Sequence, residues 1–118
     1  MTRMPSTTTF ERGSVVLVRF VFADEQGAKR RPVLVLSTSA YHAARQELIV
    51  AAVTSNVERL LPGDRAVREW RAAGLPKPSV VTGILRTVKR SMIESSLGRL
   101  RPKDLKDVDA SLRETLGL

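Results

Sequence analysis

Apolar residues in the first half of the chain gather in three short runs, and the pattern assigns each run to a strand. Ser14–Phe22 is dense in β-branched and aromatic residues, and Pro32–Ser37 and Leu48–Ser55 repeat that signal. Between the last two runs, Ala40–Gln46 is long enough for a short helix or a wide turn. Strands that follow one another without a crossover helix pair antiparallel, so we expect a small barrel or a curled sheet.

The first of these strands is apolar on both faces except at Arg19. A strand of that kind has no face for solvent. Two explanations follow: the strand is central in the fold, or it is shared with a second subunit. The second would make the protein a homodimer, because a chain of 118 residues has few places to hide that much apolar surface.

The second half of the chain begins with a break at Pro62–Asp64. An excursion follows, which we expect to be partly helical at Glu69–Ala73. Ser79–Val88 again has strand character, and Ile93–Leu100 contains a turn at Gly98.

The clearest helix begins at Pro102 and stops at Gly117. Its apolar positions are spaced by three and four residues and fall on one face: Leu105, Val108, Leu112 and Leu116. The prediction is a mainly β domain with a C-terminal helix packed across the sheet.

Length and hydropathy indicate a single domain over 10–118, preceded by a polar tail at 1–9. The longest apolar run, Leu48–Val53, has six residues, whereas a membrane helix needs about 20. We therefore expect no contact with a membrane. The first nine residues do not resemble a secretory signal, which favours the cytoplasm.

Charge and residue types narrow the chemistry. The net charge is +8, and 15 of the 20 basic residues are arginine, which suits planar contacts to phosphate. An Arg-rich proteome explains such a composition equally well. The chain has no cysteine and one histidine, His42, so disulfides, thiolate zinc sites, cysteine nucleophiles and histidine pairs are excluded. We expect no metal or cofactor, and we interpret His42, beside Tyr41, as a surface residue of a turn.

Two short motifs are candidates for chemistry. Lys29-Arg30-Arg31 precedes a buried strand, where three cations could form a positive pocket or simply a solvated hairpin tip. Thr54-Ser55 ends another strand, where hydroxyls could reach a phosphate oxygen or merely cap the strand.

These motifs and their surroundings resemble the MazF/PemK toxins from about Phe10 to the C-terminus. The order and spacing of many short motifs carry the resemblance: Phe10–Val18, Lys29–Ser37 with Tyr41, Ile49–Ser55, Pro62–Asp64, Trp70, Ala73–Leu75, Pro78–Val81, Leu97–Leu100 and Leu116–Leu118. Two places depart from it: Arg19 stands where a proline is common within the first strand, and Ile84–Arg90 stands where a Lys-Leu-Phe-Thr-like sequence is common. The resemblance therefore does not extend to the RNA sequence that is cut.

The resemblance implies a small SH3-like antiparallel barrel, a homodimer, and a ribosome-independent endoribonuclease restrained by a cognate acidic antitoxin. The reaction would be metal-free cleavage of single-stranded RNA by attack of a 2′-OH, leaving a 2′,3′-cyclic phosphate and a 5′-OH. Arg31 and Thr54 take the catalytic positions. Arginine suits the stabilisation of transition-state charge and is a poor base. Members of the family often carry an acidic residue in this loop, so Glu25 or Asp24 could serve as the base, or the two could be turn residues paired with Lys29 or Arg30.

The remaining candidates concern RNA binding, for which we predict Lys29, Arg30 and Ser55. Trp70 could stack a base or anchor the excursion to the core. Two other functions stay open: a toxin that binds DNA gyrase, which would leave Arg31 and Thr54 without a chemical role, and a nuclease-dead module that binds RNA or antitoxin.

Overall fold

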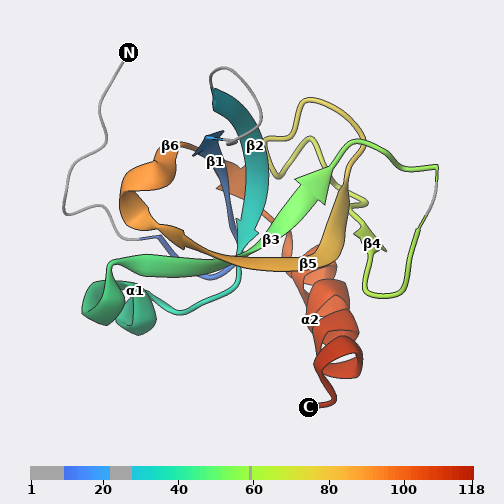
Figure 1. Cartoon of the computed structure of the whole chain (residues 1–118). Coiled ribbons are helices and arrows are strands. Elements are labelled where there is room, and N and C mark those ends of the chain that lie inside the picture. The colour runs from blue at the N-terminus through green and yellow to red at the C-terminus, as the bar shows by residue number, and fades with distance from the viewer. Residues whose placement is uncertain (1–9, 22–27, 59) are drawn as a thin grey trace.

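The computed structural model describes residues 10–21, 28–58 and 60–118, and its strands form one antiparallel sheet in the order β4-β5-β3-β2-β1-β6 (Figure 1). The strands are β1 (Ser14–Val21), β2 (Ala28–Val35), β3 (Glu47–Thr54), β4 (Arg65–Ala66), β5 (Val80–Lys89) and β6 (Ile93–Arg99). The helices are α1 (Ser39–Arg45), the 3-10 turn η1 (Arg90–Met92) and α2 (Pro102–Leu116).

The sheet is curled and buries one apolar cluster on each face. Val15, Leu34 and Val81 belong to the cluster against which Leu105 and Leu112 of α2 pack, and Val16, Val18 and Phe20 belong to the other. The curled sheet and the C-terminal helix confirm the predicted fold class, although the edge strands β4 and β6 do not pair to close a barrel. In the described part of the chain, no helix is long and apolar enough to cross a membrane.

Strand β1 is central in the fold, which was one of its two predicted places. It pairs with β2 on one side and with β6 on the other, and Val15, Val16 and Val18 are fully buried within the single chain. The two apolar faces of β1 are thus covered without a partner. The argument for a second subunit from this strand alone is wrong.

The turn predicted at Gly98 is also wrong, because Gly98 lies inside β6 and pairs with Val15. Its glycine serves a close approach between backbones. A Cβ at Gly98 would stand 2.6 Å from the carbonyl oxygen of Ala73, and one at Gly74 would stand 2.0 Å from that of Leu97. Contacts this short are essentially never observed, so the two glycines let the excursion pack directly on the strand.

The excursion predicted to be partly helical at Glu69–Ala73 is a series of turns. A buried carboxylate holds its start, because Asp104 in the first turn of α2 accepts the N–H groups of Arg68 at 3.1 Å and Glu69 at 3.0 Å. Those backbone donors are therefore satisfied by a side chain from outside the segment, and Gly74 at φ +82 ends it.

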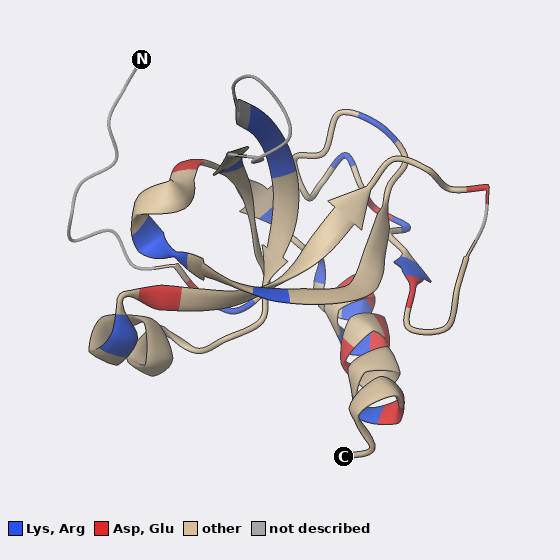
Figure 2. Ribbon diagram, in the orientation of Figure 1, with Lys and Arg blue, Asp and Glu red and all other residues tan. Residues whose placement is uncertain are grey.

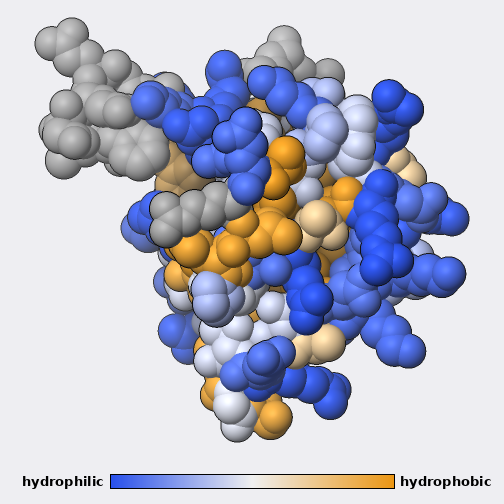
Figure 3. Space-filling view, turned by 90° about the vertical axis from the view of Figure 1, so that its right-hand side faces the viewer, coloured by the Kyte–Doolittle hydropathy of each residue, from blue (hydrophilic) through white to orange (hydrophobic). Residues whose placement is uncertain are grey.

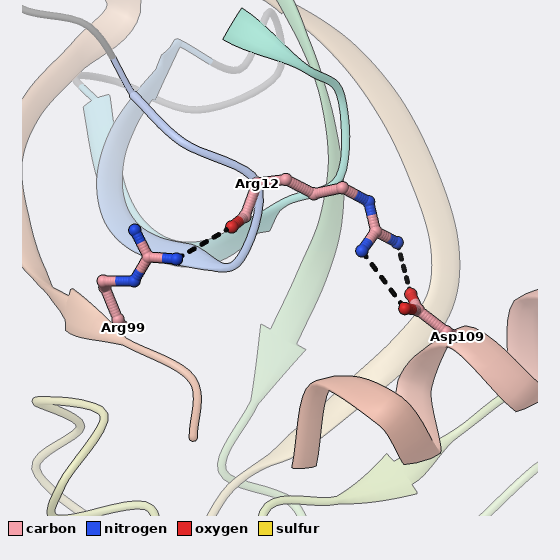
Figure 4. Close-up of polar contacts among 3 residues, drawn as sticks. All are labelled: Arg12, Arg99 and Asp109. Atoms are coloured by element: carbon pink, nitrogen blue, oxygen red, sulfur yellow. Dashed lines mark hydrogen bonds and ion pairs between the residues drawn. The ribbon is translucent and has the colours of Figure 1, made fainter. Parts of the chain in front are cut away.

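The beginning of the domain is fixed to α2 and β6 by arginines (Figure 4). The guanidinium of Arg12 forms a two-pronged contact with the carboxylate of Asp109 in α2, and Arg99 of β6 donates to the carbonyl oxygen of Arg12 at 3.3 Å. Gly13 then turns into β1 at φ +95. Helix α2 is thereby tied to the strand at the centre of the sheet.

His42 is buried, contrary to the prediction of a surface turn residue. It lies on α1 with 5% of its surface exposed, and its Nδ1 is 3.0 Å from the carbonyl oxygen of Phe10. A carbonyl only accepts, so Nδ1 carries the hydrogen and Nε2 accepts from the Ser37 hydroxyl at 2.6 Å. Burial lowers the pKa of His42, and the hydrogen bonds oppose that shift. The imidazole thus joins α1 to the start of the domain as a neutral group.

We expect acid to destabilise the fold through His42. Unfolded histidine takes up a proton near pH 6.5, before folded His42 does, so the unfolded state binds more protons below that pH and the free energy of unfolding falls. Urea unfolding at pH 7.5, 6.5 and 5.5 measures this effect. The His42→Gln variant should lose less stability than the parent between pH 7.5 and 5.5, and equal losses in the two proteins would contradict the assignment.

Candidate functional site

The site begins where β2 and β3 part. The two strands pair over only three positions, Val33–Val35 of β2 with Val50–Ala52 of β3. The next residue of β2 is Pro32, which has no N–H with which to extend the ladder. Pairing between β2 and β1 nevertheless continues through Pro32 to Ala28. An opening therefore forms between the first half of β2 and the end of β3.

An irregularity in β5 shapes the far wall of this opening. Between Ala51 and Val53 of β3, the pairing partner in β5 moves from Leu85 to Val81, so three residues of β5 stand opposite Ala52 alone. Their polar groups are satisfied locally: the Thr82 hydroxyl donates to the Ala52 carbonyl at 2.7 Å, and Gly83 N–H donates to Asp64 at 3.1 Å.

The carboxylate of Asp64 also accepts the Leu61 N–H at 2.9 Å, and so it holds the loop before β4 against β5. Gly63 and Gly83 meet there, and a Cβ on either would stand 3.3 Å from the other's Cα. The segment Pro62–Asp64, which was predicted as a break in the chain, therefore stabilises the β5 wall of the groove. Ile84, the last of the three residues in this irregularity, is 61% exposed at the groove.

The opening is a groove of about 700 Å³. Four cationic residues line it, Arg30, Arg31, Lys77 and Arg86, and no carboxylate does so among the described residues. Figure 2 shows the basic run on β2. The other lining residues are apolar or hydroxyl-bearing: Leu17, Phe20, Pro32, Val33, Ala52, Val53, Thr54, Ser55, Leu75, Pro76, Ser79 and Ile84.

Arg31 and Thr54, the predicted catalytic pair, come together in this groove. Arg31 lies in β2 opposite Val18, is exposed, and makes no hydrogen bond or ion pair with the residues that the structure describes. Its five N–H donors are available to a ligand. A planar cation whose donors are all available suits a phosphate group.

Thr54 acts as a strand-end cap and keeps a donor. Its hydroxyl oxygen accepts the N–H of Asn56 at 3.1 Å, which is the strand-capping role that the sequence analysis gave as an alternative. That bond uses a lone pair and leaves the hydroxyl hydrogen for a group in the groove. Ser55 lies next to it, exposed and in the same lining.

The other two basic residues of the motif have separate places. Arg30 lines the groove, stands opposite Arg19 in the ladder, and pairs with Glu94 of β6. The hydrogen bond to Glu94 raises the pKa of Arg30 above its ordinary value. Lys29 lies in β2, not in a turn, and is not among the residues that line the groove.

Trp70 is not among the groove residues either. It is half-buried, packs against the cluster that contains Val15, and has the guanidinium of Arg71 4.7 Å from its ring centroid. This placement matches its anchoring role. The candidate bases Glu25 and Asp24 lie outside the described residues.

Sequence reasoning missed two cations of the groove, Lys77 and Arg86. Lys77 lies between two prolines of the excursion, and Arg86 lies on β5 with its guanidinium carbon 4.8 Å from the ring centroid of Phe20. The signal that the sequence offered for Arg86 was the departure of Ile84–Arg90 from the family pattern.

Figure 3 views the side of the molecule with β4, where hydrophobic surface is bordered by hydrophilic residues.

Two comparisons of the sequence with known proteins point to the same family of toxins. A profile of the PemK-like, MazF-like toxins of type II toxin-antitoxin systems matches residues 11–116. The protein named Endoribonuclease MazF6 from Mycobacterium tuberculosis (strain ATCC 25618 / H37Rv) is 34% identical over 96 residues, which cover 79% of this chain and 83% of that protein.

Solved structures agree with the sequence comparison. MazF in a MazE-MazF structure from Deinococcus radiodurans (Form-III) has a TM-score of 0.77 at 25% identity, covering 94% of this chain and 99% of that one. The Form-I structure of MazF from the same organism has a TM-score of 0.73 at 26% identity, with the same coverage. A mycobacterial endoribonuclease in complex with its cognate antitoxin shares the fold at 19% identity, with a TM-score of 0.72 over 92% of this chain and 95% of that one.

Proposed function

The chain belongs to the PemK-like, MazF-like toxins of type II toxin-antitoxin systems, and we propose that its basic groove is the active site with which it cuts single-stranded RNA. The protein is an endoribonuclease whose partners are RNA and a cognate antitoxin. Neither gyrase binding nor a nuclease-dead role is favoured, since the relatives named above are endoribonucleases. The cytoplasm, which holds mRNA, is the proposed place of action.

One observation carries the location of the active site. Arg31 and Thr54 come from different strands, yet both line the groove that opens where β2 and β3 part. Arg30 pairs with Glu94, but the other three cations of the groove make no ion pair with the described residues, so an anionic ligand compensates their charge. Its apolar floor of Leu17 and Val33 suits bases as well as phosphates.

The reaction that suits these residues needs no protein nucleophile. The 2′-OH of one nucleotide attacks the adjacent phosphorus, the O2′–P bond forms, and the P–O5′ bond breaks. The products are a 2′,3′-cyclic phosphate and a 5′-OH. Charge develops on the nonbridging oxygens in the transition state, where the parallel donors of Arg31 stabilise it most. The Thr54 hydroxyl donates to the same phosphate.

Two proton transfers accompany this step. The 2′-OH loses a proton to a base, and O5′ gains one as it leaves. Arg31 is unsuited to accept a proton, because an arginine is protonated at any physiological pH. Glu25 or Asp24, in the segment between β1 and β2, remains the predicted base.

Removing Arg31 should affect the chemical step more than RNA binding. We expect Arg31→Ala to slow single-turnover cleavage at least about a hundredfold, because a donor to developing charge is lost. Affinity for a non-cleavable 2′-deoxy analogue should fall much less. Arg31→Lys should not restore the rate, since an ammonium lacks the planar fork.

Matched variants separate this role from bulk charge. Lys103→Ala removes an exposed cation from α2, outside the groove, and should cleave like the parent. Thr54→Ser keeps both the cap and the donor, whereas Thr54→Val loses both, so only the latter should impair cleavage. Parental cleavage by Arg31→Ala would refute the assignment of this active site.

The antitoxin is proposed to occupy the same groove as RNA. An acidic segment that folds on binding would pair with Arg30 and Arg31. We expect the cognate antitoxin to compete with labelled RNA, with an affinity that weakens as salt rises. Simultaneous binding of antitoxin and RNA to the parent protein would contradict a shared groove.

A homodimer is proposed on different grounds from those of the sequence. The chain leaves several large apolar side chains exposed, among them Leu116 at 53% and Leu118 at 86%, beside an apolar groove of about 450 Å³ between α2 and the sheet. Light scattering at micromolar concentration should give about 26 kDa, twice the 13.0 kDa of one chain. A single species at 13.0 kDa would be evidence against the dimer.

A further inference from the structure

Arg86 is the cation of the groove whose guanidinium rests against a buried aromatic ring. Its guanidinium carbon lies 4.8 Å from the ring centroid of Phe20, within the range of a cation–π contact, and Phe20 itself is 7% exposed. A buried ring cannot move out of the way. The ring therefore provides a fixed base on which the guanidinium rests.

The hydrogen-bond donors of the Arg86 side chain are unused. Among the residues that the structure describes, this side chain makes no hydrogen bond or ion pair, and Arg86 lines the groove. Contact with a ring uses the charge of the guanidinium and leaves its N–H donors for a ligand. The protein thus presents a guanidinium with unused donors to a ligand in the groove.

The other groove cations differ from Arg86 in their partner, their chemistry or their place. Arg30 forms an ion pair with Glu94, and Lys77 offers a flexible point charge. Arg31 also has unused donors, but it shares the groove with Thr54 at the proposed reaction centre. Arg86 is opposite Val50 in the ladder, four residues along β3 from Thr54, which corresponds to roughly 13 Å. Its place in the sheet is therefore away from the proposed reaction centre.

We propose that Arg86 reads a guanine base in the RNA substrate, through the O6 and N7 atoms of that base. A guanine edge offers two acceptors spaced for the arginine fork, and this is the commonest specific contact between a side chain and a base. In single-stranded RNA that edge is accessible to a side chain, whereas in an RNA duplex it lies in a deep and narrow groove. The proposal rests on the proposed endoribonuclease function and adds a specificity-determining residue to it.

The contact with Phe20 and the distance from Thr54 together favour a base as the ligand. A guanidinium that rests against a buried ring has less freedom to lose when two of its donors must meet a base edge, which lowers the entropic cost of recognition. A phosphate can also accept two parallel donors from an arginine, so the experiments below separate a base from a phosphate.

The first experiment maps the cuts that the full-length parent protein makes in a pool of RNAs with random sequence. We expect that the cleaved RNAs share a guanine at one fixed position relative to the cut. Cleavage with no guanine at any fixed position would overturn the role of Arg86 and leave the proposed function intact. Failure to cut any RNA would overturn the proposed function, and this inference with it.

The second experiment changes single atoms of that guanine in a short substrate. In the parent, 7-deazaguanine, which lacks N7, should lower kcat/KM about tenfold or more, whereas inosine, which keeps O6 and N7, should act like guanine. Arg86→Met keeps a long side chain over Phe20 and loses all of the donors, so it should cut the guanine and 7-deazaguanine substrates at equal rates. Lys77→Ala should weaken both substrates alike and keep the discrimination.

The comparison requires that the variant is folded. Residual cleavage by Arg86→Met and an unfolding transition like that of the parent establish this, since both report on the intact domain. Discrimination against 7-deazaguanine that persists in Arg86→Met would overturn the proposal. A uniform loss of affinity for all RNAs, without a change in base preference, would instead assign Arg86 to a phosphate.

Discussion

The missing N–H of Pro32 is the constraint from which the groove follows. Strand β2 pairs with β1 from Ala28 to Leu34, but its ladder with β3 ends at Val33, next to the proline. A residue with an N–H at this place could extend the ladder and draw the strands together. The opening that results exposes Arg31 on one side and Thr54 on the other. The absence of one backbone N–H thus accounts for the end of the β2–β3 ladder and for the groove beside it.

Support for the groove comes from residues that do not enter it. Asp64 secures the irregular part of β5 by accepting the Gly83 N–H, and Asp104 secures the excursion that carries Lys77. Both carboxylates accept backbone donors away from the groove. The charged residues in the described lining of the groove are therefore all cations. The acidic residues stabilise the fold where they are, and the surplus of positive charge stays available for an anion.

The sequence was sufficient for the elements and for the pair at the proposed centre. Hydrophobic periodicity is a local property, so β1, β3, β5 and α2 could be predicted from it, and the family resemblance identified Arg31 and Thr54. Contacts between distant segments could not be predicted. Gly98 looked like a turn residue because glycine favours turns, yet it is required by the carbonyl of Ala73. His42 and Arg86 likewise owe their roles to Phe10 and Phe20, with which no local pattern connects them.

The most direct test of the central claim is the chemistry of the cut ends. A short RNA that the protein cleaves is compared, in the presence of EDTA, with the same RNA carrying one 2′-deoxynucleotide on the 5′ side of the cut. The account predicts 2′,3′-cyclic phosphate and 5′-OH ends for the first, by mass spectrometry, and no cleavage at that position for the second. A 5′-phosphate end, or cleavage at the deoxynucleotide, would contradict a groove that stabilises attack by the 2′-OH.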